Sequence, residues 1–507
     1  MGILIGIDLG TTHCKAIGFK AEGDIFHTAR FATPASHPKP GWAEHPAEEL
    51  WSAIAAGIRD VVRKAKEEGE EILAVGVAGM AEAGLLIDRD MRPLTEIHAW
   101  YDKRPEPYVA WWNEEGRSDR VYRSAGIAPT AKCPLLKLQW IRDHQTGVFE
   151  KAWKWLHAPD YIAHRLTGEI GTDFSLAGRT FAFDIHERRW NPQALEIAGV
   201  PESLFPEVYK GDSPVGLVTA KAAEATGLPA GIPVVIGGHD HICGAAAVGA
   251  LESGAVVDSM GTAESLVGVV DRLPLDAIKP GGYSYGCHVT GDRHYVMGSF
   301  SASGASIEWW IDRLYSDQSG DRGGGRYRWL LDLLDRAPEG PTGVLFLPYL
   351  RGSAPPGKNP NATGALLGLR DGVDAATLMK AVLEGLACEY RRALENMPIP
   401  ARGEVIAIGG GTRNPHLMRI KAAVAGRSLV APQVDEAVAQ GAALQAGVAA
   451  GVYANLAQAA EAAYRDARRV EPDPGLMDRY DRWYREVYLQ AVRDLEGMHG
   501  ALKRFNA

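Results

Sequence analysis

The stretch that decides the fold is IGIDLGTTHCKAIGF, residues 5–19, in which an apolar strand stops at a carboxylate and a glycine turn. The strand reaches Asp8, turns through Gly10, Thr11 and Thr12, and then becomes apolar again. A glycine turn lets backbone N–H groups approach an anion closely, and threonine hydroxyls add donors. Because a carboxylate there would repel a bare phosphate, the arrangement suggests a divalent cation between the two. On its own, the stretch is explained more simply as a hairpin whose threonines bond local backbone groups.

The second half of the chain repeats this arrangement. Residues 256–270, VVDSMGTAESLVGVV, again hold an aspartate in an apolar strand, Asp258, followed by Gly261, Thr262 and another strand. Two unrelated loops would seldom share this order. The repeat therefore predicts a duplicated α/β domain with two facing hairpins, and it favours the ligand-binding interpretation of both copies.

Strand and helix patterns alternate around both copies. Residues 3–10, 14–21 and 72–80 have the composition of strands, and residues 46–69 have the periodicity of an amphipathic helix. A second long amphipathic helix is predicted for residues 477–505. Alternation of this kind predicts an α/β architecture in which ligands bind where strands end.

Length and composition limit the possible partners. A chain of 507 residues exceeds one hydrophobic core, so we expect two large domains, residues 1–247 and 248–475, and a helical extension over residues 476–507. The net charge of −9 offers no basic field for nucleic acid. The five cysteines form no CxxC pair, which is typical of a reducing compartment, and we expect a cytoplasmic protein that does not bind membranes.

Asp240 is the principal candidate for acid–base chemistry. It lies between His239 and His241 in GGHDHICGA, residues 237–245, just after an apolar strand. A carboxylate exposed at a strand end can act as a general base. Metal ligation by the two histidines and capping of the following helix by Asp240 are alternatives, and capping is compatible with catalysis.

Two glycine-rich segments differ in how well they suit phosphate or nucleotide binding. IAIGGGTRNPHLM, residues 406–418, places three glycines after an apolar strand and before a helix that opens at Pro415, which suits close approach to a nucleotide. GSAPPGKN, residues 352–359, has the glycine and lysine spacing of a P-loop. Its Pro355 and Pro356 lack the N–H groups that cradle phosphates, so we interpret this segment as a loop.

A further polar group lies in the first half of the chain. Glu82 follows a predicted strand, and Trp100, Asp102 and Arg104 occur close together in residues 96–105. Hydrogen-bonding groups beside an aromatic face suit polyhydroxylated ligands. Surface charge around a buried tryptophan is the simpler explanation of these residues taken alone.

Together these motifs resemble the FGGY family of carbohydrate kinases, a branch of the actin-like ATPase superfamily. The resemblance covers nearly the whole chain in order: GIDLGTT, GWAEHPAEELW, KLQWIRDH, GGHDHICGAAAVGA, DSMGTAES, SGASIEWW, PYLRGSAPPGKNPNATGALLGL, VLEGLACEY, GGGTRNPHLM and AQGAALQAGVAAG. It implies two actin-like (ribonuclease H-like) α/β domains with a central cleft for ATP and substrate. It also implies ATP and Mg²⁺ as cofactors, and it leaves open whether the chain forms a homodimer.

The resemblance also implies roles by position. Asp240 matches the catalytic base, and Asp8 matches the acidic residue that holds Mg²⁺ through water. The positions that match the phosphate and nucleotide contacts are Thr11, Thr12, Gly261, Thr262, Gly304, Glu308, Gly410 and Asn414. The positions expected near the sugar or polyol are Ala81, Glu82, Trp100, Asp102, Lys132, Asp240 and Glu264.

Departures from the family pattern bear on the substrate. Glycerol kinases carry Arg-Glu and xylulokinases Met-His where this chain has Ala81 and Glu82. Lys132 replaces a small or aromatic residue, and Glu264 adds a polar group after Gly-Thr. We therefore expect an ATP-dependent kinase that phosphorylates a hydroxyl of a xylulose-like ketose, a pentulose or a hexulose, or of a related polyol, with Asp240 as the general base. The alternatives are an actin-like ATPase or a phosphohydrolase that uses no sugar acceptor.

Overall fold

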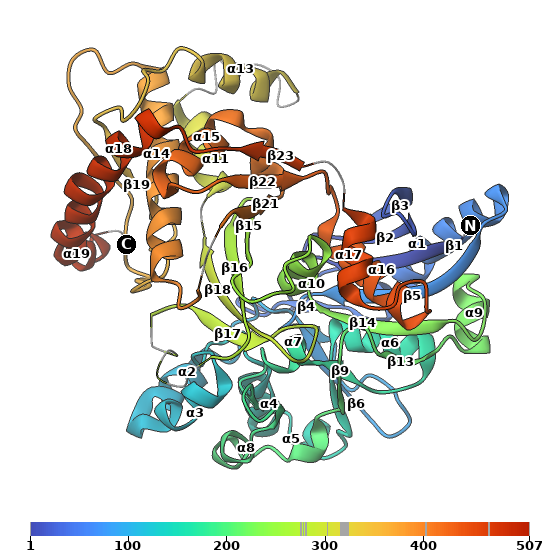
Figure 1. The fold of residues 1–507 in the computed structure, drawn as a ribbon. Coiled ribbons are helices and arrows are strands. Elements are labelled where there is room, and N and C mark those ends of the chain that lie inside the picture. The colour runs from blue at the N-terminus through green and yellow to red at the C-terminus, as the bar shows by residue number, and fades with distance from the viewer. Residues whose placement is uncertain are drawn as a thin grey trace.

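The protein folds into two α/β domains (Figure 1). The structure is a computed structural model that describes residues 2–273, 276, 278, 281–301, 303–314, 324–400, 403–464 and 467–505. In the described part of the chain, no helix is long and apolar enough to cross a lipid bilayer.

The first domain is built on a six-stranded sheet with the order β13-β14-β5-β1-β2-β3. β1 and β2 form the antiparallel hairpin expected around the first glycine turn, with Leu9 opposite Cys14. β5 and β14 continue the sheet in parallel on the other side of β1. The strands are β1 (Gly2–Leu9), β2 (His13–Lys20), β3 (Ile25–Ala32), β5 (Glu71–Gly79), β13 (Pro214–Leu217) and β14 (Pro233–His239).

The second domain repeats this core. Its sheet has the order β17-β18-β16-β15-β21-β22-β23, with β15 and β16 antiparallel and β21 parallel to β15. The strands are β15 (Val256–Met260), β16 (Glu264–Val270), β17 (Ser284–Cys287), β18 (His294–Phe300), β21 (Val405–Ile408), β22 (Leu429–Pro432) and β23 (Ala467–Val470). The duplicated hairpin inferred from the two Asp…Gly-Thr stretches is thus confirmed.

Two helices join the domains. α10 (Asp240–Ala247) and α16 (Ala437–Ala449) pack on each other, and α16 also lies across β1, β5 and β14 of the first sheet (Figure 1). Glycines make this contact possible: a Cβ atom at Gly6 or at Gly76 would overlap the carbonyl oxygen of Ala439 or of Ala442. The backbone of α16 therefore rests directly on the sheet that carries Asp8.

Helices and a small sheet complete the first domain. The four-stranded sheet β4-β7-β6-β8 carries the loops that hold Glu82 and Trp100. Its strands are β4 (Glu44–His45), β6 (Gly84–Ile87), β7 (Ile97–His98) and β8 (Lys154–His157). The helices are α1 (Ala47–Glu68), α2 (Glu106–Asn113), α3 (Arg117–Ala125), α4 (Pro134–His144), α5 (Thr146–Phe149), α6 (Ala158–Thr167), α7 (Phe174–Ala177), α8 (Pro192–Ala198) and α9 (Ala220–Thr226).

In the second domain, long helices cover the sheet and the C-terminal segment docks on them. The helices are α11 (Gly304–Leu314), α13 (Gly324–Leu334), α14 (Ala375–Asn396), α15 (Pro415–Ala425), α17 (Leu456–Ala463), α18 (Pro474–Arg482) and α19 (Leu489–Lys503). α18 continues into α19 through a π-helical stretch, so the predicted terminal helix forms. Tyr480 and Tyr488 each donate a hydrogen bond to a glutamate of α14.

The remaining elements are short. They are β9 (Thr172–Asp173), β10 (Phe183–Asp184), β11 (Arg189–Trp190), β12 (Val208–Tyr209), β19 (Leu345–Leu347) and β20 (Ala365–Leu367). They pair among themselves in two-stranded sheets outside the two main sheets.

Candidate active site

A cavity of about 600 Å³ opens between the two domains. Its wall in the first domain includes Thr11, Glu82, Trp100 and Asp240. Its wall in the second domain is formed by residues 281–284, Met297, Ser299 and Lys358. This size suits a small organic ligand.

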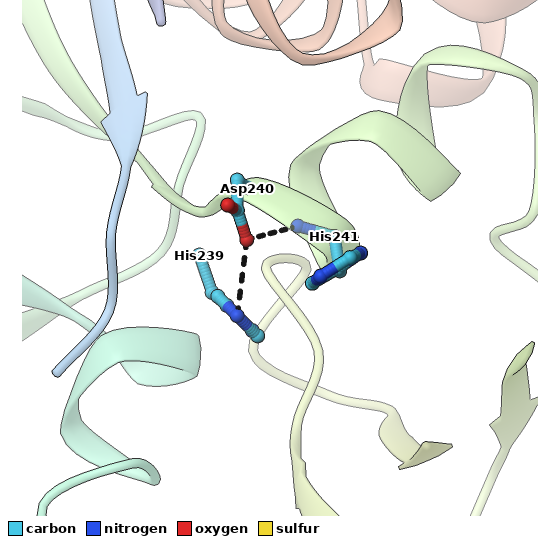
Figure 2. Close-up of side chains that lie close together, drawn as sticks. All are labelled: His239, Asp240 and His241. Carbon is cyan, nitrogen blue, oxygen red and sulfur yellow. Dashed lines mark hydrogen bonds and ion pairs between the residues drawn. The ribbon is translucent and has the colours of Figure 1, made fainter. Parts of the chain in front are cut away.

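Asp240 stands at the junction of β14 and α10, as the first residue of the helix. Its carboxylate Oδ1 accepts the backbone N–H of His241 at 2.7 Å and lies 3.1 Å from His239 Nε2 (Figure 2). Burial raises the pKa of Asp240, but His241 and His239 outweigh burial and hold the pKa well below its usual range. Asp240 is therefore an ionised acceptor on the cavity wall.

Hydrogen bonds to the capped N-terminus of α7 hold the end of β14 in place. The backbone N–H of His239 donates to Ser175 Oγ at 2.8 Å, and that hydroxyl donates to Asp173 Oδ1 at 2.7 Å. Asp173 is also the N-cap of α7 and accepts from two N–H groups there. The position of Asp240 is thus set by hydrogen bonds rather than by loop flexibility.

His239 and His241, the alternative metal ligands, lie next to the Asp240 carboxylate. One ligand atom each of His239, Asp240 and His241 lies within 4.8 Å of the others. Both neighbouring residues contact the same carboxylate oxygen, Asp240 Oδ1.

Glu82 lies on the cavity wall opposite a buried arginine. Arg179 Nε and one of its terminal nitrogens donate to Glu82 Oε1 at 3.0 and 2.5 Å. Burial raises the pKa of Glu82, but Arg179, His239 and Lys132 together lower it to about 2. Ala81 lies beside it on the same wall, where its methyl group leaves room for a ligand.

Trp100 forms a flat face of the cavity. Its indole N–H donates to Thr11 Oγ1 at 2.8 Å, which ties the acceptor side of the cavity to the first glycine turn. The ammonium of Lys132 lies 4.6 Å from the centre of the Trp100 ring. The Trp100 ring, which offers a stacking surface, and the hydrogen-bonding groups of Glu82 and Lys132 therefore lie on the same wall, an arrangement that suits a sugar.

Asp102 lies behind this wall. It is 1% exposed, accepts the Ala43 N–H at 2.7 Å, and is held by the Arg104 guanidinium at 2.9 Å. It is absent from the residues that line the cavity. Its expected contact with the sugar is therefore corrected: both carboxylate oxygens are used to hold the loop after Trp100.

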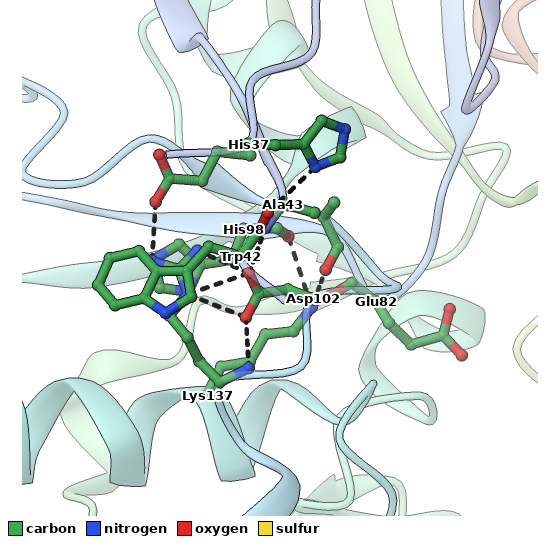
Figure 3. A network of polar contacts seen from close by, with 10 residues as sticks. His37, Trp42, Ala43, Glu82, His98, Asp102 and Lys137 are labelled. Atoms are coloured by element: carbon green, nitrogen blue, oxygen red, sulfur yellow. Dashed lines mark hydrogen bonds and ion pairs between the residues drawn. The ribbon is translucent and has the colours of Figure 1, made fainter. Parts of the chain in front are cut away.

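Lys137, on α4, holds the loops of Glu82 and Trp100 together. Its buried ammonium donates to the carbonyl oxygens of Glu82 at 2.5 Å and of Ala99 at 2.9 Å (Figure 3). Figure 3 also shows the Glu82 carboxylate pointing away from this network. Burial lowers the pKa of Lys137 to about 8, against the opposing effects of Glu82 and Asp102.

We expect Lys137→Met to raise the KM for the acceptor about tenfold or more, because two buried carbonyl groups lose their donor at about 1–3 kcal/mol each. The KM for ATP should change little, since the Lys137 ammonium donates to the loops expected to bind the acceptor and not to the segments expected to bind ATP. Steady-state kinetics together with thermal unfolding checks this expectation. The exposed Lys151→Met is the control, and an unchanged acceptor KM would show that Lys137 does not position these loops.

Asp8 fits the expected magnesium position. It is the penultimate residue of β1, and burial and the nearby Asp240 raise its pKa to about 7, while Lys15 Nζ, at 4.0 Å, lowers it. The Lys15 ammonium is itself engaged by Glu436 at 2.5 Å. Two partly buried carboxylates near each other, those of Asp8 and Asp240, supply the kind of oxygen ligands that a divalent cation prefers.

The residues expected at the nucleotide lie on three turns and on helix α11. Thr12 is exposed in the first hairpin, and Gly261 and Thr262 form the turn between β15 and β16. Gly304 starts α11, and its N–H donates to Gly261 O at 3.1 Å, which joins this helix to the second hairpin. Except for Thr11, the predicted nucleotide residues do not line the 600 Å³ cavity.

The other three nucleotide candidates have local partners. Glu308 is exposed on α11 and pairs with Arg326 at 3.0 Å. Gly410 begins the turn after β21, where an added Cβ would meet nothing within 4 Å. Asn414 caps α15 by accepting the Leu417 N–H at 3.1 Å.

Glu264 is separated from the acceptor cavity. It is 2% exposed, accepts from Ser303 Oγ at 2.6 Å and pairs with Lys421 at 2.9 Å. Lys421 also pairs with Asp258, the aspartate of the second repeat. The expected substrate role of Glu264 is therefore corrected: its carboxylate neutralises a buried lysine beneath the second hairpin.

Sequence reasoning did not find Arg179, Lys137 or Lys358 as residues of the site. Arg179 pairs with Glu82 across 97 positions, and no local pattern signals such a partner. The sequence did contain one local signal here: Gly168 ends α6, and five residues later Asp173 caps α7, the short helix that precedes Arg179.

Comparison with protein families places the chain. Residues 3–249 match the N-terminal domain, and residues 257–450 the C-terminal domain, of the FGGY family of carbohydrate kinases. A glycerol kinase of Thermococcus gammatolerans is 30% identical over 461 residues, covering 89% of this chain and 90% of that protein. A xylulose kinase of Bacillus subtilis is 25% identical over 507 residues, covering 100% and 99%.

The fold is shared with a solved relative. The crystal structure of xylulose kinase from Rhodospirillum rubrum superposes with a TM-score of 0.89 at 27% identity, over 98% of this chain and 100% of that one. Both family domains, in order, and the two-domain actin-like fold are therefore present. The chain belongs to the FGGY family of carbohydrate kinases and is a phosphotransferase that acts on an alcohol group.

Proposed function

We propose that the protein transfers the γ-phosphoryl group of ATP to a hydroxyl of a sugar or polyol bound in the interdomain cavity, with Asp240 as the general base. The observation that carries this proposal is the ionised Asp240 carboxylate on the cavity wall, fixed by His239 and His241. Asp240 takes the proton of the acceptor hydroxyl as that oxygen bonds to phosphorus and the bond to the ADP oxygen breaks.

The two hairpins would hold the phosphates. Thr11 and Thr12 on one side and Gly261 and Thr262 on the other supply backbone and hydroxyl donors, and the turn at Gly410 would receive the nucleoside. Asp8 would hold Mg²⁺ through water, and the cation would neutralise charge on the transferred phosphate. The donor set supports this assignment, because burial and the nearby Asp240 carboxylate raise the pKa of Asp8, and a cation at this position would offset both effects.

The acceptor is a sugar or polyol, as in the relatives named for glycerol and xylulose. Ala81 and Glu82 match neither the Arg-Glu of glycerol kinases nor the Met-His of xylulokinases. The Arg179 guanidinium donates a hydrogen bond to Glu82 Oε1 and so holds this carboxylate in place as an acceptor for substrate hydroxyls. The free, buried cysteines suit the cytoplasmic location expected from the sequence.

A panel of acceptors tests the proposal. Purified protein with MgATP should form ADP rapidly only when one of the ketopentoses, ketohexoses, polyols, aldonates or sugar monophosphates is present. Removal of Mg²⁺ with a chelator should abolish this stimulation. ADP formation at one unchanged rate with every acceptor would favour an ATPase or phosphohydrolase instead.

A further inference from the structure

Two lysines reach the cavity from opposite domains. Lys132 lies just before α4 in the first domain, and Lys358 lies in the loop of residues 352–360 in the second. The Lys132 ammonium rests over the Trp100 ring at 4.6 Å. Within the described ranges, neither lysine has a carboxylate at ion-pair distance.

Lys358 is held in place by its backbone. The N–H groups of Gly357 and Lys358 donate to the carbonyl of Gly281 at 3.0 and 3.4 Å. The side-chain stem packs on Gly282, where an added Cβ would stand 2.5 Å from Lys358 Cβ. The segment that resembles a P-loop is thus a docked loop that delivers one cation to the cavity.

Three cationic side chains line the cavity, those of Lys132, Arg179 and Lys358. Partial burial lowers the pKa of Lys358, and Lys132 and Arg179 lower it further. Lys132 and Arg179 also act on Glu82 from the other side. Lys132, Arg179 and Lys358 therefore form one group of positive charges across the cavity.

Among the described residues, no carboxylate on the wall pairs with either lysine. Arg179 is neutralised by Glu82, and the Asp240 carboxylate accepts from His239 and His241. Asp119 is exposed on α3 and, in the part of the chain that the structure covers, forms no ion pair with a lysine. Lys132 and Lys358, both exposed to solvent in the cavity, are thus left without an ion-pair partner among the residues that the structure describes.

The nucleotide phosphates are not the natural partner of these two lysines. Of the residues proposed to hold ATP, only Thr11 lines this cavity. Lys132 shares its wall with Trp100 and Glu82, which belong to the acceptor side. Both lysines are therefore available to an anionic group on the acceptor.

We propose that the acceptor is a polyhydroxylated compound with an anionic end, a carboxylate or a phosphate, which Lys132 and Lys358 bind from the two domains. The inference rests on the kinase function proposed above and narrows its substrate class. Ammonium groups bind either anion as point charges, so the shared chemistry is the anionic terminus.

The test compares acceptors of equal chain length that differ at one end: a ketose, the corresponding aldonate and the corresponding sugar monophosphate. We expect one of the two anionic compounds to have a kcat/KM at least about tenfold above that of the neutral ketose. Lys132→Met and Lys358→Met should each raise its KM about tenfold or more, with the KM for ATP unchanged. Lys358→Arg should retain most of the affinity, because it keeps the charge.

The outcomes separate this inference from the function it rests on. Lys151 is exposed and does not line the cavity, so Lys151→Met should leave kcat and the KM values for acceptor and ATP unchanged. A neutral acceptor used equally well or better, or a rise in the KM for ATP in place of that for the acceptor, would overturn the anionic class alone. Failure of every acceptor to be phosphorylated would overturn the kinase proposal together with it.

Discussion

Asp240→Asn is expected to lower kcat about 10²–10⁴-fold, the range that a positioned general base contributes. The substitution keeps the size of the side chain but removes the negative charge that accepts the proton. Affinity for MgATP should change less than about twofold, since no proposed phosphate donor is altered. Single-turnover kinetics with the best acceptor, together with calorimetric titration of nucleotide, measures both quantities.

Two features make this expectation sharp. The backbone N–H of His239 donates to Ser175 and that of His241 donates to Asp240 Oδ1, an acceptor that asparagine keeps, so asparagine should occupy the same position and the protein should remain folded. Asp90→Asn, an exposed aspartate paired only with Arg92, is the control and should keep full activity. If Asp240→Asn retained more than about half of the wild-type kcat, proton removal by this residue would be refuted.

Lys421→Met is expected to destabilise the second domain by about 3–5 kcal/mol, the usual cost of leaving a buried charge without its partner. Lys421 has no exposed side-chain surface and pairs with Asp258 and with Glu264, at 2.9 Å from the latter. Its ammonium also lies 4.2 Å from the centre of the Tyr390 ring. Removing it leaves two buried carboxylates, and burial and Glu264 already hold the pKa of Asp258 above its ordinary value.

Scanning calorimetry measures this effect as a lower unfolding temperature. The triple variant Lys421→Met, Asp258→Asn, Glu264→Gln should recover most of the loss, because it removes the charges along with the lysine. An equal loss in the single and triple variants would mean that side-chain packing, rather than uncompensated charge, explains the destabilisation. The second hairpin lies between Asp258 and Glu264, so the single variant should also bind MgATP more weakly.

The sequence predicted the parts of the fold that local patterns encode. Both hairpins carry their signal in fifteen neighbouring residues, and the repeat of Asp8 and Asp258 before Gly-Thr is legible without a structure. Asp240 was recognisable because a carboxylate directly after an apolar strand falls at a strand end.

Other parts depend on long-range pairing that no local pattern shows. Glu264 looked available to substrate, but Lys421, 157 positions away, neutralises it. Asp102 looked like a sugar contact, but Arg104 and the backbone of Ala43 occupy both its oxygens. Lys358 belongs to a segment that lacks the N–H groups of a P-loop, and its place at the cavity depends on the hydrogen bonds of its loop to Gly281, which no sequence pattern shows.

The central claim is that this cavity joins a phosphoryl group to an acceptor hydroxyl with Asp240 as base. The most direct measurement is detection of the phosphorylated acceptor by ³¹P NMR after incubation with MgATP and the acceptor panel. The wild type should yield a phosphate ester in the same amount as ADP, and Asp240→Asn should yield almost none while still binding MgATP. Inorganic phosphate without any ester from the wild type, or equal ester from the variant, would contradict the account.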